Sequence, residues 1–110
     1  MAQNRRYQRQ DPASKIIRKY WGKYGADEEA LKAAIKEDLA QGDSELVHGM
    51  SEVRMKMSIP GEEEEAIRLV EEEGGQTLED PKIQHARAWL NQIVQFADGV
   101  WVEYKMEHMR

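Results

Sequence analysis

Residues 83–97 carry the strongest periodic signal in the chain. Six apolar side chains recur there at intervals of three and four: Ile83, Ala86, Leu90, Ile93, Val94 and Ala97. A helix turns once every 3.6 residues, so these side chains share one face, which Trp89 and Phe96 widen. Asp80-Pro81 is typical of a helix start, and Asp98-Gly99 is expected to end the helix. We therefore predict a helix between these signals, at the centre of the hydrophobic core.

Two further helices are predicted near the N-terminus. Asp11-Pro12 is a start signal of the same kind, and Gly25 is a typical residue after a helix end. An apolar stripe lies between them: Ile16, Ile17, Tyr20, Trp21 and Tyr24. The second helix is expected to begin at Asp27 and to end before Gly42, with its own stripe: Leu31, Ala34, Ile35 and Leu39. Because the connection is short, we expect a helical hairpin.

Two segments alternate between apolar and polar residues, which is typical of a half-buried strand. The first spans residues 52–60 and has four apolar positions: Val53, Met55, Met57 and Ile59. Residues 44–51 before it either finish a helix or begin the strand, and Gly49 argues against a long helix there. The second strand is predicted over residues 100–106. The alternative is a short helix with Trp101, Tyr104 and His108 on one side.

Residues 62–73 form an acidic segment that we interpret as a helix ended by Gly74-Gly75. The predicted order is α-α-β-α-α-β. This is a mostly helical α+β fold, in which an N-terminal helical hairpin and two helices pack on a small antiparallel β-ribbon or sheet. A two-stranded ribbon is marginal alone, so we expect strand pairing within a homodimer or higher oligomer.

The length of 110 residues favours one domain. We expect residues 1–10 to form a basic arm and residues 11–110 the single α+β domain. No apolar run approaches 18 residues, and the first residues lack the apolar region of a secretory signal. Cysteine is absent, which excludes disulfides and thiolate catalysis. The expected location is the cytoplasm of a cell or of an infected cell.

The net charge of −5 conceals a marked asymmetry. Residues 1–24 carry one acidic residue and seven basic ones: Arg5, Arg6, Arg9, Lys15, Arg18, Lys19 and Lys23. The remaining residues carry nine basic and twenty acidic groups. Such a split indicates that one end meets a polyanion, or an acidic surface of a copy or partner. A solvated basic helix is the alternative.

No motif for catalysis, a cofactor, a metal or a small-molecule substrate is present. His48, His85 and His108 have no metal-ligand spacing, and no serine lies in a nucleophile motif. Carboxylates are abundant in the acidic helix: Glu62, Glu63, Glu64, Glu65, Glu71, Glu72 and Glu73. They lack the apolar surroundings that would raise a pKa toward catalytic values. The sequence therefore predicts a protein that acts by binding.

Three hypotheses follow. The first is a self-associating adaptor or structural subunit whose basic segment docks on an acidic surface of a copy or partner. The second is a nucleic-acid-binding protein that uses the same seven cations for phosphate contacts. The third is an inhibitor whose acidic helix occupies a basic groove of a host nucleic-acid enzyme or defence system. That strategy is similar to one used by small phage-encoded proteins, and it implies a phage or mobile-element origin.

A resemblance supports the second hypothesis. The alternating run Val53–Pro60, the acidic helix and the helix after it resemble a ribbon-helix-helix DNA-binding unit. Members of that family pair strands in a dimer and read the major groove with outward side chains. The resemblance implies that Arg54, Lys56 and Ser58 read DNA. The chain departs from the pattern at Glu63, where an apolar residue is expected.

Overall fold

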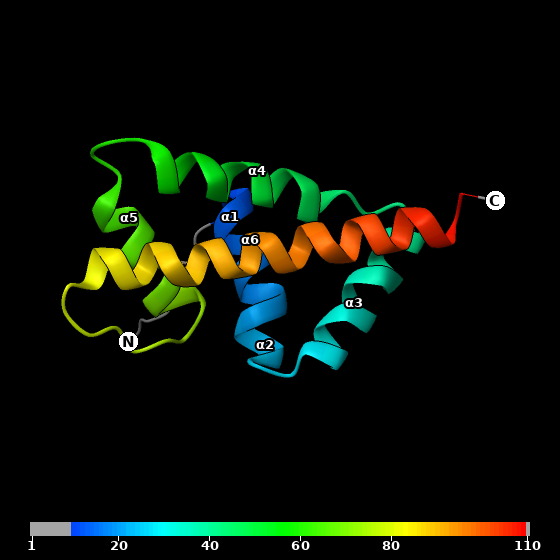
Figure 1. The fold of residues 1–110 in the computed structure, drawn as a ribbon, viewed down its shortest axis with the longest axis horizontal. Coiled ribbons are helices and arrows are strands. Elements are labelled where there is room, and N and C mark those ends of the chain that lie inside the picture. The colour runs from blue at the N-terminus through cyan, green and yellow to red at the C-terminus, as the bar shows by residue number, and fades with distance from the viewer. Residues whose placement is uncertain (1–9, 110) are drawn as a thin grey trace, which may run out of the picture.

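The computed structural model describes residues 10–109, which form helices and contain no strand (Figure 1). The elements are α1 (Pro12–Ile16), η1 (Ile17–Trp21), α2 (Gly22–Tyr24), α3 (Glu28–Ala40), α4 (Glu45–Ser58), α5 (Glu63–Arg68), η2 (Leu69–Glu73) and α6 (Lys82–Glu107). The elements α1, η1 and α2 follow one another without a gap and form one continuous helix, and α5 and η2 form another. In both helices the part labelled η is a π-helical turn. The predicted α+β class is therefore wrong, and the structure is a small helical bundle.

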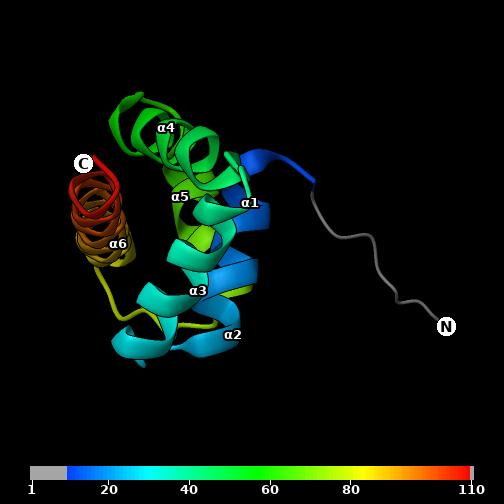
Figure 2. The ribbon, with the colours of Figure 1, turned by 90° about the vertical axis from the view of Figure 1, so that its right-hand side faces the viewer.

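The long helix α6 faces all the others. Figure 2 shows α6 nearly end-on, with α4 above it, α1 and α5 across from it, and α2 and α3 below. The molecule measures 47 × 33 × 23 Å along its principal axes, and α6 accounts for most of the longest dimension. This helix spans 26 residues, or about 39 Å at the 1.5 Å rise of an α-helix.

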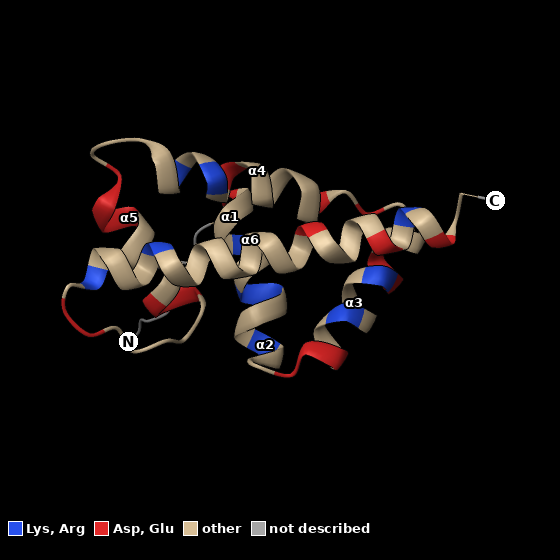
Figure 3. Cartoon of the chain, in the orientation of Figure 1, with Lys and Arg blue, Asp and Glu red and all other residues tan. Residues whose placement is uncertain are grey.

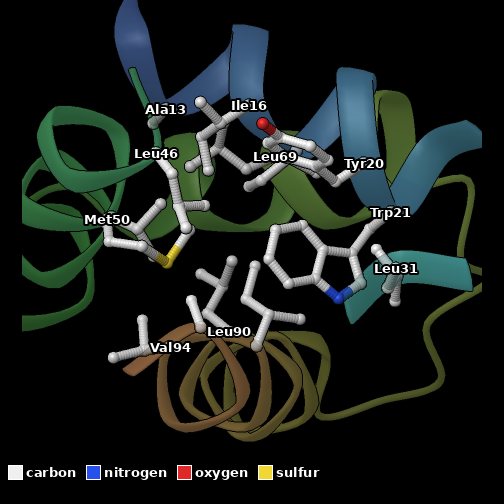
Figure 4. Close-up of a cluster of buried hydrophobic side chains, with 14 of the residues drawn as sticks. Ala13, Ile16, Tyr20, Trp21, Leu31, Leu46, Met50, Leu69, Leu90 and Val94 are labelled. Atoms are coloured by element: carbon white, nitrogen blue, oxygen red, sulfur yellow. The ribbon is translucent and has the colours of Figure 1, made fainter. Parts of the chain in front are cut away.

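The core fills the space between α6 and the curved layer of shorter helices (Figure 4). The predicted stripes of the first helix, of α3 and of α6 point into it. Its fully buried large side chains come from six elements: Ile16, Ile17, Tyr20, Leu31, Ile35, Val53, Leu69, Val70 and Leu90. The helices predicted between Asp11 and Gly25, between Asp27 and Gly42 and over residues 62–73 are thus confirmed, and so is the first part of α6.

The predicted strand over residues 52–60 is the second half of α4. The buried positions of α4 are Leu46, Gly49, Met50 and Val53, which follow a helical and not an alternating period. Met55, the second apolar residue of the alternation, is 56% exposed. The alternation was wrong as a strand signal because only part of its apolar side chains reach the core. Gly49 does not interrupt the helix either.

The predicted strand over residues 100–106 is the last part of α6. Val100 is buried, and Trp101 and Tyr104 pack against the core at helical spacing. The alternative of a helix here was right, since the Tyr104 and His108 rings stack one turn apart with 4.1 Å between their centroids, but the helix is the end of α6 and not a short separate one. Asp98-Gly99 does not end the helix. Residues 10–109 contain no strand, so the predicted pairing of strands between copies cannot take place there.

Gly49 allows α1 and α4 to cross closely. A Cβ at this position would lie 2.3 Å from Cγ1 of Ile16 and 3.0 Å from the carbonyl oxygen of Pro12. Carbon atoms in ordinary contact are separated by about 3.5–4.0 Å. Glycine is therefore required here by the space between the two helices.

No helix within residues 10–109 has both the length and the apolar character that crossing a bilayer requires.

Candidate binding surface

The cations of the first helix are largely engaged by carboxylates of the same chain. Lys15 Nζ lies 3.3 Å from Glu45, and Lys19 Nζ lies 3.1 Å from Asp38 and 3.2 Å from Asp43. Arg18 pairs with a glutamate of η2, as described below. Lys23 makes no ion pair among the described residues, and its ammonium lies over the Tyr24 ring. Arg5, Arg6 and Arg9 lie outside the described residues.

The pKa values of Lys19 and Asp43 reflect the ion pairs between Lys19 and its two aspartates. Partial burial would lower the pKa of Lys19, but hydrogen bonds to Asp38 and Asp43 raise it above its ordinary value. The backbone N–H of Glu45 and then the Lys19 ammonium lower the pKa of Asp43. Tyr20 donates a 2.6 Å hydrogen bond to Asp38. The charge of Lys19 is therefore neutralised by Asp38 of α3 and by Asp43 in the loop after α3.

A second ion network joins the two π-helical turns. The Glu73 side chain is only 8% exposed, and it accepts from Arg18 Nη1 at 2.9 Å and from Arg68 Nη1 at 3.1 Å. Arg68 also pairs with Glu65 at 2.7 Å and donates to Ser14 Oγ at 2.7 Å. The bonds to Glu65, and then to Glu73, raise the pKa of Arg68 against the effect of burial. Two guanidinium groups are thus matched by two carboxylates, which suits a role in packing the helices.

Most carboxylates of the predicted acidic helix are paired as well. Glu62 and Glu65 each lie 3.6 Å from Lys56, Glu63 lies 3.7 Å from Arg87, and Glu71 lies 3.1 Å from Lys82. Glu64 and Glu72 make no ion pair within residues 10–109. The seven glutamates therefore do not form one uniform acidic face.

The three residues implied as DNA readers lie in the last turns of α4. Arg54 pairs with Asp98 of α6, and Lys56 pairs with Glu62, the residue before α5, and with Glu65 of α5. The Ser58 hydroxyl donates to the carbonyl oxygen of Arg54. Because this segment is a helix, the ribbon on which the resemblance rests is absent from the described residues.

Paired charge is the general rule in the described part of the chain. Every Lys and Arg there pairs with a carboxylate except Lys23 and Lys105. Each of these two ammonium groups lies over an aromatic ring, that of Tyr24 or Trp101. The folded body therefore offers few free cations to a polyanion.

Carboxylates, in contrast, remain in excess along one edge. The acidic segments at the start of α3, at the end of η2 and in the loop before α6 are spread along the lower side of Figure 3. Besides Asp27, which accepts from the backbone N–H of Ala30 as the N-cap of α3, five exposed carboxylates of these segments make no ion pair among the described residues: Glu28, Glu29, Glu72, Glu79 and Asp80. We call this group the acidic edge. Sequence reasoning assigned the negative surface to residues 62–73, since it could not see which of those glutamates are neutralised.

The comparisons with known proteins add no relative. No family model, curated protein or solved structure matches this chain. In residues 10–109, no cluster of His, Asp and Glu is arranged to hold a metal ion.

A second exposed feature was not predicted. Val102 and Met106 lie one turn apart on α6 and are 53% and 69% exposed. They line a shallow groove together with Asp98, Gly99, Glu103 and Glu107. Exposed apolar side chains that share a face are typical of contact surfaces. A strand would place Val100, Val102 and Met106 on one side, so the strand interpretation grouped the two exposed side chains with the buried Val100.

Proposed function

We propose that this protein is a non-enzymatic binding protein that self-associates. In this proposal, the basic segment 1–10 of one copy docks on the acidic edge of a second copy. One observation carries it: nearly every cation of the folded body is neutralised within the chain, whereas five carboxylates of the acidic edge are not. The complementary charge in the sequence lies at Arg5, Arg6 and Arg9.

Self-association fits this distribution because one chain contains both halves of the contact. Two copies related by a two-fold axis would make it twice, once in each direction. Opposite charges of this kind govern the encounter and the register of a complex more than its affinity. The apolar side chains Val102 and Met106 would supply area that a second copy can cover.

The test is the oligomeric state of the full chain, measured by sedimentation velocity over a wide range of protein and salt concentrations. The wild-type chain is expected to associate at low salt and to dissociate as salt screens the exposed charges. The triple variant Arg5→Gln, Arg6→Gln, Arg9→Gln is expected to remain monomeric.

A matched control removes the two cations of the body that have no ion pair. The variant Lys23→Gln, Lys105→Gln leaves segment 1–10 and the acidic edge intact, so its salt-dependent association should match that of the wild type. A wild-type chain that stays monomeric at every concentration would refute the proposal. Equal association of the wild type and the triple variant would also refute it.

The same variants separate this proposal from nucleic-acid binding. Lys15, Arg18 and Lys19 already have carboxylate partners, so phosphate contacts would have to displace them. We therefore expect only weak binding to a duplex of arbitrary sequence at low salt. Tight binding that is lost in the triple variant would favour the nucleic-acid alternative instead.

A further inference from the structure

A half-enclosed cavity of about 200 Å³ opens beside the acidic edge. It lies where η1, the connection between α2 and α3, and α6 meet. Three aromatic side chains line it, namely Trp21, Trp89 and Phe96. The Trp21 and Phe96 rings stand at 80° to each other with 6.4 Å between their centroids, so they form a corner. Pockets for drug-sized molecules are about 300–1,000 Å³, so this one suits a single side chain.

The indole N–H of Trp21 has no acceptor in the described residues. Trp21 is 6% exposed, and no hydrogen bond to its ring is formed within residues 10–109. Figure 4 shows the indole nitrogen on the side of the ring nearest Leu31, which also lines the cavity. A buried donor without an acceptor is costly, and buried tryptophans usually have one. The acceptor must therefore come from solvent or from a bound group.

The polar lining favours a cation. Glu28 of the acidic edge lies at the cavity, is exposed, and makes no ion pair with any described residue. The other polar side chains there are the amides of Gln76 and Gln92, and no Lys or Arg lines the cavity. Aromatic faces attract cations, and a planar guanidinium both stacks on rings and bonds a carboxylate through two N–H groups.

We propose that this cavity is an arginine pocket that receives one arginine of residues 5–9 from a second copy. The guanidinium stacks in the aromatic corner and donates to Glu28, while the Trp21 N–H donates to a carbonyl oxygen of the same segment. The proposal rests on the proposed function and specifies the side chain that the acidic edge recognises. Arginine fits better than lysine, because the cavity combines flat rings with a carboxylate.

The test uses the full-length triple variant at positions 5, 6 and 9 and a synthetic peptide of residues 1–10. The ¹⁵N-labelled protein gives separate indole N–H signals for its three tryptophans. Adding the peptide should shift the Trp21 signal and leave the Trp101 signal in place. A peptide with Gln at positions 5, 6 and 9 should shift neither.

Two matched substitutions in the triple variant then distinguish peptide binding in the cavity from binding to the acidic edge in general. Glu28→Gln is expected to weaken peptide binding about tenfold, because a hydrogen bond to a charged group is lost. Glu72→Gln removes an equally exposed charge of the acidic edge away from the cavity, and should weaken binding less than about twofold. Neither side chain is buried or ion-paired, so both variants are expected to fold, which circular dichroism will verify.

The outcomes distinguish the two proposals. If the peptide binds but leaves the Trp21 signal unchanged, or if Glu28→Gln and Glu72→Gln weaken binding equally, the pocket is refuted while docking on the acidic edge stands. If the peptide does not bind at all and the wild-type chain is monomeric, the proposed function itself fails.

Discussion

Substituting Gly49 tests the close crossing of α1 and α4 directly. In Gly49→Ala, the new Cβ would lie 2.3 Å from Cγ1 and 2.9 Å from Cγ2 of Ile16. Ile16 is completely buried, so its side chain has no free space into which to turn. The carbonyl oxygen of Pro12, 3.0 Å from the new atom, blocks a purely side-chain adjustment. The two helices must therefore move apart by about 1 Å to restore ordinary contact distances.

Two opposing effects determine the size of the change. Alanine stabilises a helix interior by about 0.8–1 kcal/mol relative to glycine. Overpacking of a close-packed core costs about 1–3 kcal/mol, and the short distances to Ile16 and Pro12 place this site in the upper part of that range. We expect a net loss of about 1–2 kcal/mol in the free energy of unfolding. For a chain of this length that corresponds to a fall of about 4–8 °C in Tm.

Gly99 provides the matched control. It lies in the interior of α6, and a Cβ there would meet nothing within 4 Å. Gly99→Ala should therefore show the propensity gain alone, a stabilisation of about 0.5–1 kcal/mol. Urea unfolding followed by circular dichroism measures both variants. The double variant Gly49→Ala, Ile16→Ala should lose less stability than the two single changes combined, because the two side chains then no longer collide.

The comparison of the two stability changes tests whether α1 and α4 cross closely. If Gly49→Ala and Gly99→Ala stabilise the chain by similar amounts, α1 and α4 do not cross as closely as described. The explanation of Gly49 as a packing residue would then be wrong.

Three further changes test the charge pairing. Glu73→Gln should lower the free energy of unfolding in urea by about 2 kcal/mol, because it leaves the partly buried Arg18 and Arg68 beside a neutral amide. The control Glu72→Gln should change the free energy of unfolding by less than about 0.5 kcal/mol. Arg54→Gln removes an ion pair whose two side chains are about half exposed, so a thermal melt should shift by no more than about 2 °C, and a larger fall would contradict its assignment as a surface pair. The lowered pKa of Asp43 means that its contribution to stability is complete above the ordinary value of 3.8 and is lost as the pH falls through the lower folded value. Asp43→Asn should therefore reduce the free energy of unfolding at neutral pH and make it fall less steeply as the pH is lowered. If urea unfolding shows the same dependence on acid pH in the variant and the wild type, the neighbours of Asp43 do not stabilise its charged form.

The errors in the predicted fold have one physical origin. Over eight residues, an alternating pattern and a helical pattern share many positions, and Val53 and Met57 satisfy both. Which pattern applies depends on what lies opposite. Here the backbone of α1 packs against Gly49 and selects the helical face, and the same crossing explains a glycine that looked like a helix breaker. No window along the chain contains that information.

The candidate site divides in the same way. The charge asymmetry and the cluster of aromatic residues near Trp21 are visible in the sequence. The pairing of Lys19 with Asp38 and Asp43, and of Arg18 with Glu73, joins residues between 19 and 55 positions apart. The pairing decides which charges remain free, so the acidic edge could not be predicted from composition.

By itself, the sequence determined the helices whose apolar stripes run for several turns between clear start and stop signals. Those stripes suffice because a long amphipathic helix buries its apolar face against almost any partner. The tertiary structure alone decided that α4 and the end of α6 are helical, that most cations are neutralised, and that Trp21 and Glu28 line the same cavity. These features depend on contacts between residues far apart in the chain, where packing overrides the local pattern.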